Sequence, residues 1–123
     1  MNIRHLDGAD PLDCAALARL AEIAVAATSH VSIGALRARH RGGAPAARAR
    51  QTAMYLAHVA FGLTFTRVGI CFGRDRTTVR HACALIEDRR DDPRQEFALT
   101  ALEASLLALT GSLAAVTHGE CRS

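Results

Sequence analysis

A single glycine, Gly73, separates two short amphipathic segments of the 123-residue sequence, and this arrangement constrains the fold more than any other feature. The segment before it, 65–72, and the segment after it, which ends near residue 89, both have apolar residues at spacings of three and four, the period of a helix. These apolar residues are Val68, Cys71, Phe72, Val79, Ala82, Cys83 and Ile86. Two short helices joined by a tight, glycine-containing turn form a helix-turn-helix. The pattern therefore predicts that motif.

Four further segments are predicted to be helical, so we expect an all-α bundle of about six helices. Alanine is the commonest residue and aromatic residues make up only 4%, a composition that favours closely packed helices over strands. Ser32, Thr64 and either Asp75 or Thr77 are predicted N-caps, and Gly62 is predicted to end the third helix. In chain order, the expected helices cover about 10–29, 33–39, 46–61, 65–72, 76–89 and 93–109.

The length of the chain predicts one domain with short extensions. We expect Gly111 to weaken the last helix, and its leucines leave two alternatives open. They cover the core, which we favour, or they form a seam for a homodimer or a protein partner. The leucines of that seam are Leu99, Leu102, Leu106 and Leu109. The expected divisions are a flexible leader over 1–9, the helix-turn-helix domain over 10–90, the C-terminal helix over 91–117 and a frayed tail over 118–123.

Positive charge is concentrated in one part of the sequence. Between Arg37 and Arg80 there are nine arginines and one acidic residue, whereas the rest of the chain has six arginines and eleven acidic residues. Such segregation is typical of a surface that binds nucleic acid, because an ordinary solvated surface mixes its charges more evenly. The charge pattern therefore predicts double-stranded DNA as the partner of the helix-turn-helix.

The second helix of such a motif enters the major groove with its first residues against the base edges. Here those residues are Arg74, Asp75, Arg76, Thr77 and Thr78. Arginine grips a guanine edge, aspartate accepts a hydrogen bond from cytosine, and threonine offers a hydroxyl or a methyl group. The residue types at this end therefore suit direct reading of a DNA sequence.

The strings ARQTAMYLA and GRDRTTVRHACALIE, within residues 47–87, closely resemble the C-terminal duplex-binding domain of the bacterial replication initiator DnaA. The resemblance covers about 10–90 and is weaker before residue 47. It implies a fold like that domain, similar to Trp repressor. The chain is also similar to stand-alone initiator-like domains of alphaproteobacteria, some of which regulate transcription, including activation factors for gene transfer agents.

The resemblance implies roles for matching residues. Arg50 and Gln51 fall where the family contacts phosphates, His81 matches a histidine near the phosphates, and the basic loop at 37–41 matches one that enters the minor groove. Arg74, Asp75, Thr77 and Thr78 match the start of the recognition helix. The full set of predicted DNA-binding residues is Arg37, Arg39, Arg41, Arg48, Arg50, Gln51, Phe65, Thr66, Arg74, Asp75, Arg76, Thr77, Thr78, Arg80 and His81.

Three departures from the family pattern affect the expected DNA site. Arg76 stands where the family has a base-contacting histidine, and arginine favours a guanine edge. Only Gly73 lies between Phe72 and Arg74, where the family usually has two residues, so the turn is tighter. Thr66 stands in place of a common proline, and Arg67, in place of a common glutamate, adds positive charge.

No residue pattern indicates an enzyme. Asp75 lies between two arginines that keep it ionised, and no paired carboxylates, Ser/His/Asp set or metal-binding cluster is visible. The sequence has no phosphate-binding GxxxxGK[ST] loop, so we expect no nucleotide, cofactor or metal. The four cysteines form no CxxC, and Cys71 and Cys83 are expected to be buried thiols. We expect a cytoplasmic, nucleoid-associated protein without a membrane segment.

Three functions remain open from the sequence alone. We favour a sequence-selective transcription regulator. The alternatives are a replication modulator that occupies initiator boxes, the DNA sites of the replication initiator, and an interaction module that has lost selective DNA binding. The arginine excess argues against the third. A single helix-turn-helix that reads one half-site binds weakly, so a homodimer or a protein partner is expected with the first.

Overall fold

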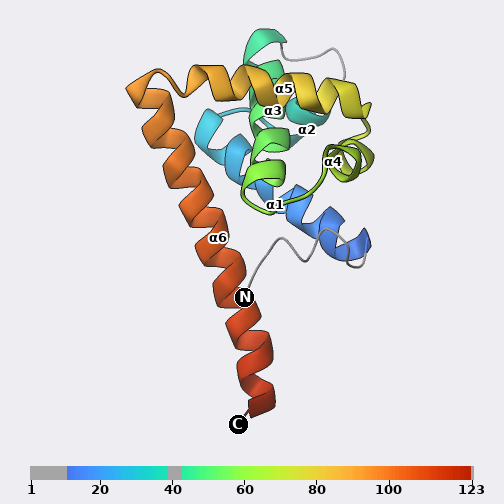
Figure 1. Ribbon diagram of the computed structural model, residues 1–123, viewed down its shortest axis with the longest axis vertical. Coiled ribbons are helices and arrows are strands. Elements are labelled where there is room, and N and C mark those ends of the chain that lie inside the picture. Colours follow the sequence, from blue (N-terminus) through green and yellow to red (C-terminus); the bar gives the residue numbers. More distant parts are fainter. Residues whose placement is uncertain (1–10, 39–42, 123) are drawn as a thin grey trace.

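The computed structural model describes the backbone of residues 11–38 and 43–122, and side chains within 13–38 and 43–111. This part of the chain contains helices and no strands, which confirms the all-α prediction. The helices are α1 (Pro11–Ser29), α2 (Ile33–Arg37), α3 (Gly43–Val59), α4 (Phe65–Phe72), α5 (Arg76–Arg89) and α6 (Pro93–Arg122). In Figure 1, α1 to α5 form a bundle around α3, while α6 turns back from the end of α5 and extends past the bundle.

The core combines large apolar side chains with alanines at the closest helix contacts. Alanines on α1 and α3, among them Ala21, Ala53 and Ala57, are completely buried. Side chains this small let two helix backbones approach each other closely, so α1 packs directly on α3. Larger fully buried side chains fill the remaining space, and these include Leu36, Met54, Leu56, Phe61, Leu63, Val68, Val79 and Ile86.

Two predicted N-caps are confirmed by hydrogen bonds. The hydroxyl of Ser32 accepts from the N–H of Ala35 at 3.0 Å, and the hydroxyl of Thr64 accepts from the N–H of Arg67 at 3.1 Å. Each cap satisfies a backbone donor that has no partner within the first turn of its helix. These caps fix where α2 and α4 begin.

The boundaries of α2 and α3 differ from the prediction. α2 ends at Arg37 rather than near residue 39, because the backbone of Ala38 is extended, with ψ of 145°; the carbonyl of Leu36 accepts from Arg50. α3 begins at Gly43 rather than near residue 46. Pro45 is compatible with this earlier start, because proline fits the first turn of a helix, where its missing N–H has no partner to lose.

A network around Arg90 joins the start of α6 to the bundle. Its guanidinium donates to Glu96 at 2.6 Å, to Glu103 at 2.8 Å and to the hydroxyl of Tyr55 at 2.9 Å. The Tyr55 hydroxyl in turn donates to Glu87 at 2.7 Å. Helices α3, α5 and α6 therefore meet at one charged junction.

The leucines of α6 divide between the core and the surface. Leu99 and Leu106 are buried against the bundle, Leu102 is half-buried, and Leu109 is 45% exposed. α6 is also longer than predicted, because it continues through Gly111 to Arg122. One glycine inside a helix costs only about 1 kcal/mol relative to alanine, which the good helix formers around it outweigh.

Candidate nucleic-acid interface

The first turns of α5 present polar side chains to solvent. Asp75 holds the N-cap position, but its side chain makes no capping hydrogen bond and is exposed. Arg76, Thr77 and Thr78 follow it and are also exposed. The opposite face of α5 is the predicted apolar stripe, and all four of its residues are buried: Val79, Ala82, Cys83 and Ile86. Burial of that stripe against α3 and α4 fixes which side chains of α5 face outward.

The turn between α4 and α5 is held by backbone contacts. Gly73 ends α4 in the left-handed conformation, with φ of 65°, which is common for a glycine at the end of a helix. The N–H groups of Gly73 and Arg74 both donate to the carbonyl of Gly69. A Cβ atom on Gly69 would lie 2.5 Å from the carbonyl oxygen of Arg74, so residue 69 has no room for a side chain. The shortened turn thus depends on two glycines.

A shallow groove of about 370 Å³ runs between α3 and the first half of α5. It brings together six predicted residues that lie far apart in the sequence: Arg50, Gln51, Arg74, Thr77, Thr78 and His81. Arg48 does not line this groove, although it lies on the same helix as Arg50 and Gln51. Arg80 is exposed on α5 but does not line it either.

Arg50 lines the groove and also links α3 to the end of α2 by hydrogen bonds. Its guanidinium donates to the carbonyl of Leu36 at 2.8 Å and also to the carbonyl of Ala38, at the C-terminus of α2. Burial, and to a lesser extent the charge of nearby Arg74, lowers the pKa of Arg50. The predicted phosphate contact of Arg50 stays a prediction, and it would have to use the donors that α2 leaves free.

Arg74 is half-buried and lines the same groove as Arg50. Its Nε atom is buried and has no hydrogen-bond partner among the described residues. A guanidinium donor without a partner is costly to bury, and a phosphate or a base edge would supply the missing acceptor. The predicted contact of Arg74 with DNA stays a prediction.

A buried carboxylate organises the arginines behind the turn. Glu22 is 2% exposed, and its Oε1 accepts from Arg19 at 2.6 Å and from Arg37 at 3.0 Å. Arg19 also donates to the carbonyl of Cys71 on α4 at 2.9 Å. Together with Arg50 and Arg74, these residues line a small cavity of about 180 Å³. Four arginines thus surround one carboxylate, which leaves an excess of positive charge next to the α4–α5 turn.

Sequence reasoning missed Arg19 and Glu22 as parts of this cluster. Their spacing of three along α1 was the only signal, and it does not show that Glu22 is buried or that Arg37 reaches it. Arg39 and Arg41, the rest of the predicted minor-groove loop, lie outside the described residues. Of the three arginines of that loop, the structure therefore describes only Arg37.

The two predicted residues at the start of α4 differ in their surroundings. Phe65 is half-buried, and its ring stacks on His58 with the ring centroids 4.3 Å apart. The Nδ1 atom of His58 also lies 2.7 Å from the carbonyl oxygen of Leu63. Thr66 is exposed. Phe65 therefore packs against the end of α3, whereas Thr66 is accessible to a ligand.

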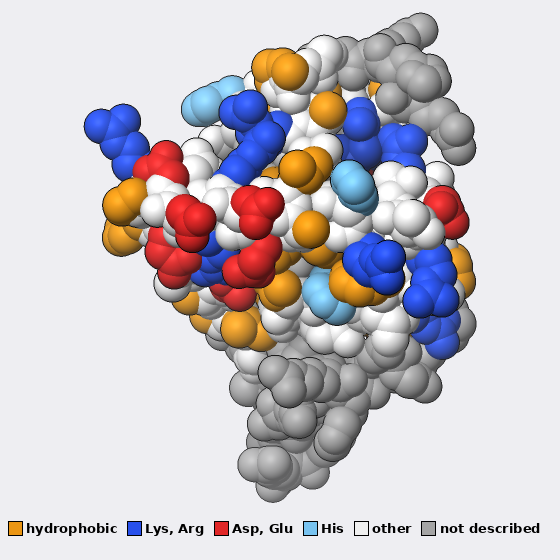
Figure 2. All heavy atoms as spheres, turned by 45° about the horizontal axis from the view of Figure 1, so that its top comes forward, with side chains coloured by type: hydrophobic (Ala, Val, Ile, Leu, Met, Phe, Trp, Pro, Cys, Tyr) orange, Lys and Arg blue, Asp and Glu red, His pale blue; other side chains and the backbone are white. Residues whose placement is uncertain are grey.

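Charge is divided between the two ends of α5. Figure 2 shows acidic side chains gathered at one end of this face, at the corner between α5 and α6, with a few arginines among them and further arginines across the rest of the face. The acidic corner contains Asp88, Asp91, Asp92 and Glu96, all of them exposed. The electrostatic field of the molecule therefore directs a polyanion toward the first turns of α5 and away from the acidic corner.

The fold and this surface define a helix-turn-helix protein with a basic, solvent-exposed recognition face. The family model for the bacterial dnaA protein helix-turn-helix matches residues 22–86, more than half of the chain, and the chain belongs to that family. No curated protein matches the chain significantly. The match confirms the predicted family and indicates binding to double-stranded DNA. It includes α5 as far as Ile86 and leaves α6 outside.

Two searches of the described residues gave negative results. No group of three or more histidine, cysteine or acidic side chains lies close enough together there to hold a metal ion. None of the helices in that part of the chain is long and apolar enough to cross a membrane.

Proposed function

We propose that the protein is a sequence-selective regulator of transcription that reads double-stranded DNA through the first turns of α5. The observation that carries the proposal is the exposed run from Asp75 to Thr78, whose side chains the fold itself does not use. Side chains that serve only stability would be expected to pack or to form hydrogen bonds within the protein. Thr77 and Thr78 of this run line the groove against α3, and the groove and the arginine cluster would supply contacts to the DNA backbone.

Each part of the surface has a distinct role in this proposal. Arg76 grips a guanine edge in the major groove, and Thr77 contacts the neighbouring base pair. Arg74 and the N–H groups at the start of α5 bind phosphates, which positions the helix but carries no sequence information. Replacement of the family's histidine by Arg76 changes the preferred bases.

A second candidate function is modulation of replication by occupying initiator boxes. Asp75, Thr77 and Thr78 match the family pattern and are all exposed, which favours this alternative. It requires that Arg76 and the shortened turn leave the preference for the box intact. The two functions therefore differ in the DNA sequence that the protein selects.

The experiment combines selection of bound sequences from random duplex DNA with fluorescence anisotropy at several salt concentrations. We expect a selected duplex to bind at least tenfold more tightly than its scrambled version, because one bidentate base contact is worth roughly 1–3 kcal/mol. Selection of the initiator box would support the replication function, and a different sequence would support the transcription function. Salt-dependent binding to every duplex alike would contradict both.

Two variants test the recognition helix directly. Arg76→Ala and Thr77→Ala should each lower the preference for the selected duplex, with little effect on binding to the scrambled duplex in the case of Thr77→Ala. Arg94→Ala is the matched control, because Arg94 is an exposed arginine at the start of α6, beside the acidic corner. If Arg94→Ala lowers selectivity as much as Arg76→Ala, net charge rather than base contact determines binding.

The proposal includes a contact of α6 with a protein partner or with a second copy of the chain. Phe97 is 78% exposed, and Leu107 and Leu109 are about half as exposed. Apolar side chains at these positions support an interface, because α6 offers more apolar surface than the bundle covers. Sedimentation of the free protein and of its DNA complex measures whether a second copy is recruited.

A further inference from the structure

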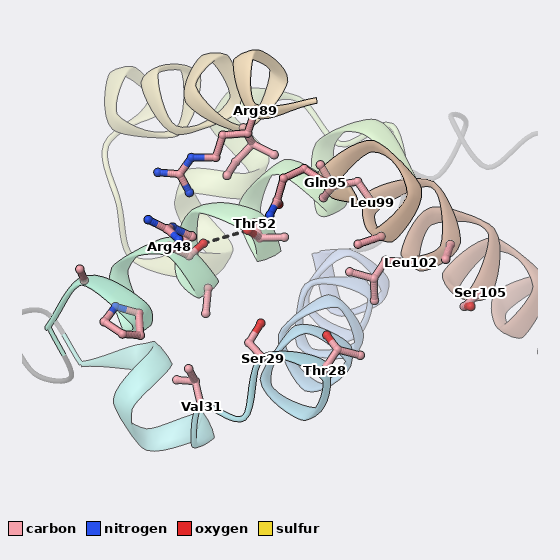
Figure 3. Close-up of a pocket in the computed structure, with 16 residues that line it drawn as sticks. Thr28, Ser29, Val31, Arg48, Thr52, Arg89, Gln95, Leu99, Leu102 and Ser105 are labelled. Carbon is pink, nitrogen blue, oxygen red and sulfur yellow. Dashed lines mark hydrogen bonds between the residues drawn. The ribbon is translucent and has the colours of Figure 1, made fainter. Parts of the chain in front are cut away.

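A second cavity lies away from the recognition face, between the end of α1, the start of α3, the end of α5 and the start of α6 (Figure 3). Its volume is about 620 Å³, which is in the range of pockets for small organic molecules. Much of its wall is apolar, and the apolar residues that matter here are Val31, Pro45, Ile86, Leu99 and Leu102. α6 completes the cavity, so the family-matched region alone does not form it.

Two arginines stand on one wall of this cavity. Figure 3 shows the guanidinium groups of Arg48 and Arg89 on the same side, with the side chains of Thr28 and Ser29 across from them. No acidic residue lines the cavity, and neither arginine forms an ion pair within the described residues. The Nη1 atom of Arg89 is buried and lacks a hydrogen-bond partner there.

Exposed arginines without an ion pair are common here, but among the described residues only Arg74 and Arg89 have a buried guanidinium nitrogen without a hydrogen-bond partner. Arg19 and Arg37 are paired with Glu22, Arg90 is paired with Glu96 and Glu103, and Arg50 donates to backbone carbonyls. Arg74, the other arginine with a buried unpartnered nitrogen, lies at the recognition face, where DNA supplies acceptors. Arg89 lies at the opposite end of α5, so a ligand in this cavity, rather than DNA at the recognition face, is placed to supply its acceptor.

We propose that this cavity binds a small organic carboxylate with an apolar body. The carboxylate accepts hydrogen bonds from Arg48 and Arg89, whose planar guanidinium groups match its two oxygens. The apolar body lies against Ile86, Leu99 and Leu102 on the remaining walls. Two arginines with no acid in the same cavity favour an anion, and the apolar residues of the lining favour one with an apolar body over free phosphate.

The ligand would touch the two helices that matter for function. Ile86 and Arg89 belong to α5, the recognition helix, while Leu99 and Leu102 belong to α6. A bound acid would therefore fasten α6 to α5 and stabilise the folded protein by mass action. This inference does not rest on the proposed function, because binding of the acid is measured without DNA.

The test is isothermal titration of the whole chain with two probes, phenylbutyrate and octanoate. Phenylbutyramide, which has the same body without the charge, and acetate, which has the charge without the body, are the controls. We expect at least one probe to bind with a Kd in the millimolar range or below, and both controls to bind at least tenfold more weakly. Absence of binding by both probes, or equal binding of phenylbutyrate and its amide, would overturn the proposal.

Two variants locate the site. Arg89→Gln removes one charge, and Ala101→Phe fills the cavity from an exposed position on α6 while leaving both arginines in place. Each should weaken probe binding at least tenfold, whereas Arg94→Gln should not change it. Circular dichroism confirms that each variant is folded. If Arg89→Gln lowers affinity for DNA and leaves probe binding unchanged, Arg89 is a phosphate contact and the proposal is wrong.

Discussion

The carbonyl oxygen of Arg74 faces Gly69 so closely that a Cβ atom on residue 69 would lie 2.5 Å from it. The contact joins the middle of α4 to the residue that opens the recognition segment. Because the obstacle is backbone, it has no flexible side chain to move aside. The position of α5 relative to α4 therefore depends on the absence of a side chain at residue 69.

Gly69→Ala should destabilise the protein and weaken selective DNA binding together. We expect a loss of about 1–3 kcal/mol in the free energy of unfolding, as for other overpacked sites, measured by urea titration. Gly111→Ala is the control, because a Cβ atom there meets nothing within 4 Å. If Gly69→Ala unfolds at the same urea concentration as the unmodified protein, the close approach does not constrain the turn.

Removing the buried carboxylate should affect stability and DNA affinity in opposite directions. Glu22→Gln leaves Arg19 and Arg37 without a counter-ion, so we expect a loss of stability of roughly 1–3 kcal/mol. Affinity for duplex DNA should rise, because the freed guanidinium of Arg37 can bind a phosphate, and the salt dependence of binding should become steeper.

Asp88→Asn is the matched control for that change. It also removes one negative charge, but from an exposed residue of the acidic corner. Urea titration and anisotropy on the same duplex give both readouts. An equal gain in affinity from Glu22→Gln and Asp88→Asn would show that net charge alone, and not Arg37, is responsible.

The only tyrosine of the chain should titrate at unusually high pH. Burial, followed by the hydrogen bond to Glu87, raises the pKa of Tyr55 to about 12. The unfolded chain loses this proton near pH 10, so the contribution of Tyr55 to stability is complete below pH 10 and is lost as the pH rises to about 12. Burial raises the pKa of Cys83 to about 11, which acts in the same direction.

Ultraviolet absorbance of the phenolate reports Tyr55 alone, because no other tyrosine and no tryptophan is present. Glu87→Gln should lower the pKa of Tyr55, since the carboxylate disfavours the phenolate. A titration of the folded protein centred near pH 10 would show that the hydroxyl is not in the network described.

The network around Arg90 should control how firmly α6 is attached. Arg90→Met keeps most of the aliphatic side chain but removes the donors to Tyr55, Glu96 and Glu103. We expect faster hydrogen exchange in the first turns of α6, measured by mass spectrometry, with little change in α1 and α3. Arg94→Met serves as the control, and equal exchange rates in the two variants would contradict this role of Arg90.

Patterns among residues close together in the sequence predicted the helices, their N-caps and the turn between α4 and α5. The helical spacing of apolar residues and the glycine at position 73 located α4, the turn and α5, and the capping residues Ser32 and Thr64 were identified from their chemistry. The exposed residues of α5 followed from the same spacing. These features depend on residues within a few positions of each other, so one sequence is sufficient to predict them.

The arrangement of the arginines could not be predicted in this way. Arg37 and Glu22 are fifteen residues apart, and Arg50 reaches the end of α2 across fourteen. Such contacts depend on the packing of α1, α2 and α3, which sequence spacing does not determine. Arg48, two residues before Arg50, lines a different cavity because residues two apart on a helix do not face the same side, and this difference does follow from the helical spacing.

The 14-residue length of α5 also sets the distance between the proposed base-reading residues and α6, where a protein partner is proposed to bind. At 1.5 Å per residue, the helix separates its base-reading end from the start of α6 by about 20 Å, the length of roughly six base pairs of DNA. A protein held by α6 would therefore sit beside the occupied groove rather than in it. Occupancy of the DNA and recruitment of a second protein would be compatible events, and neither would have to displace the other.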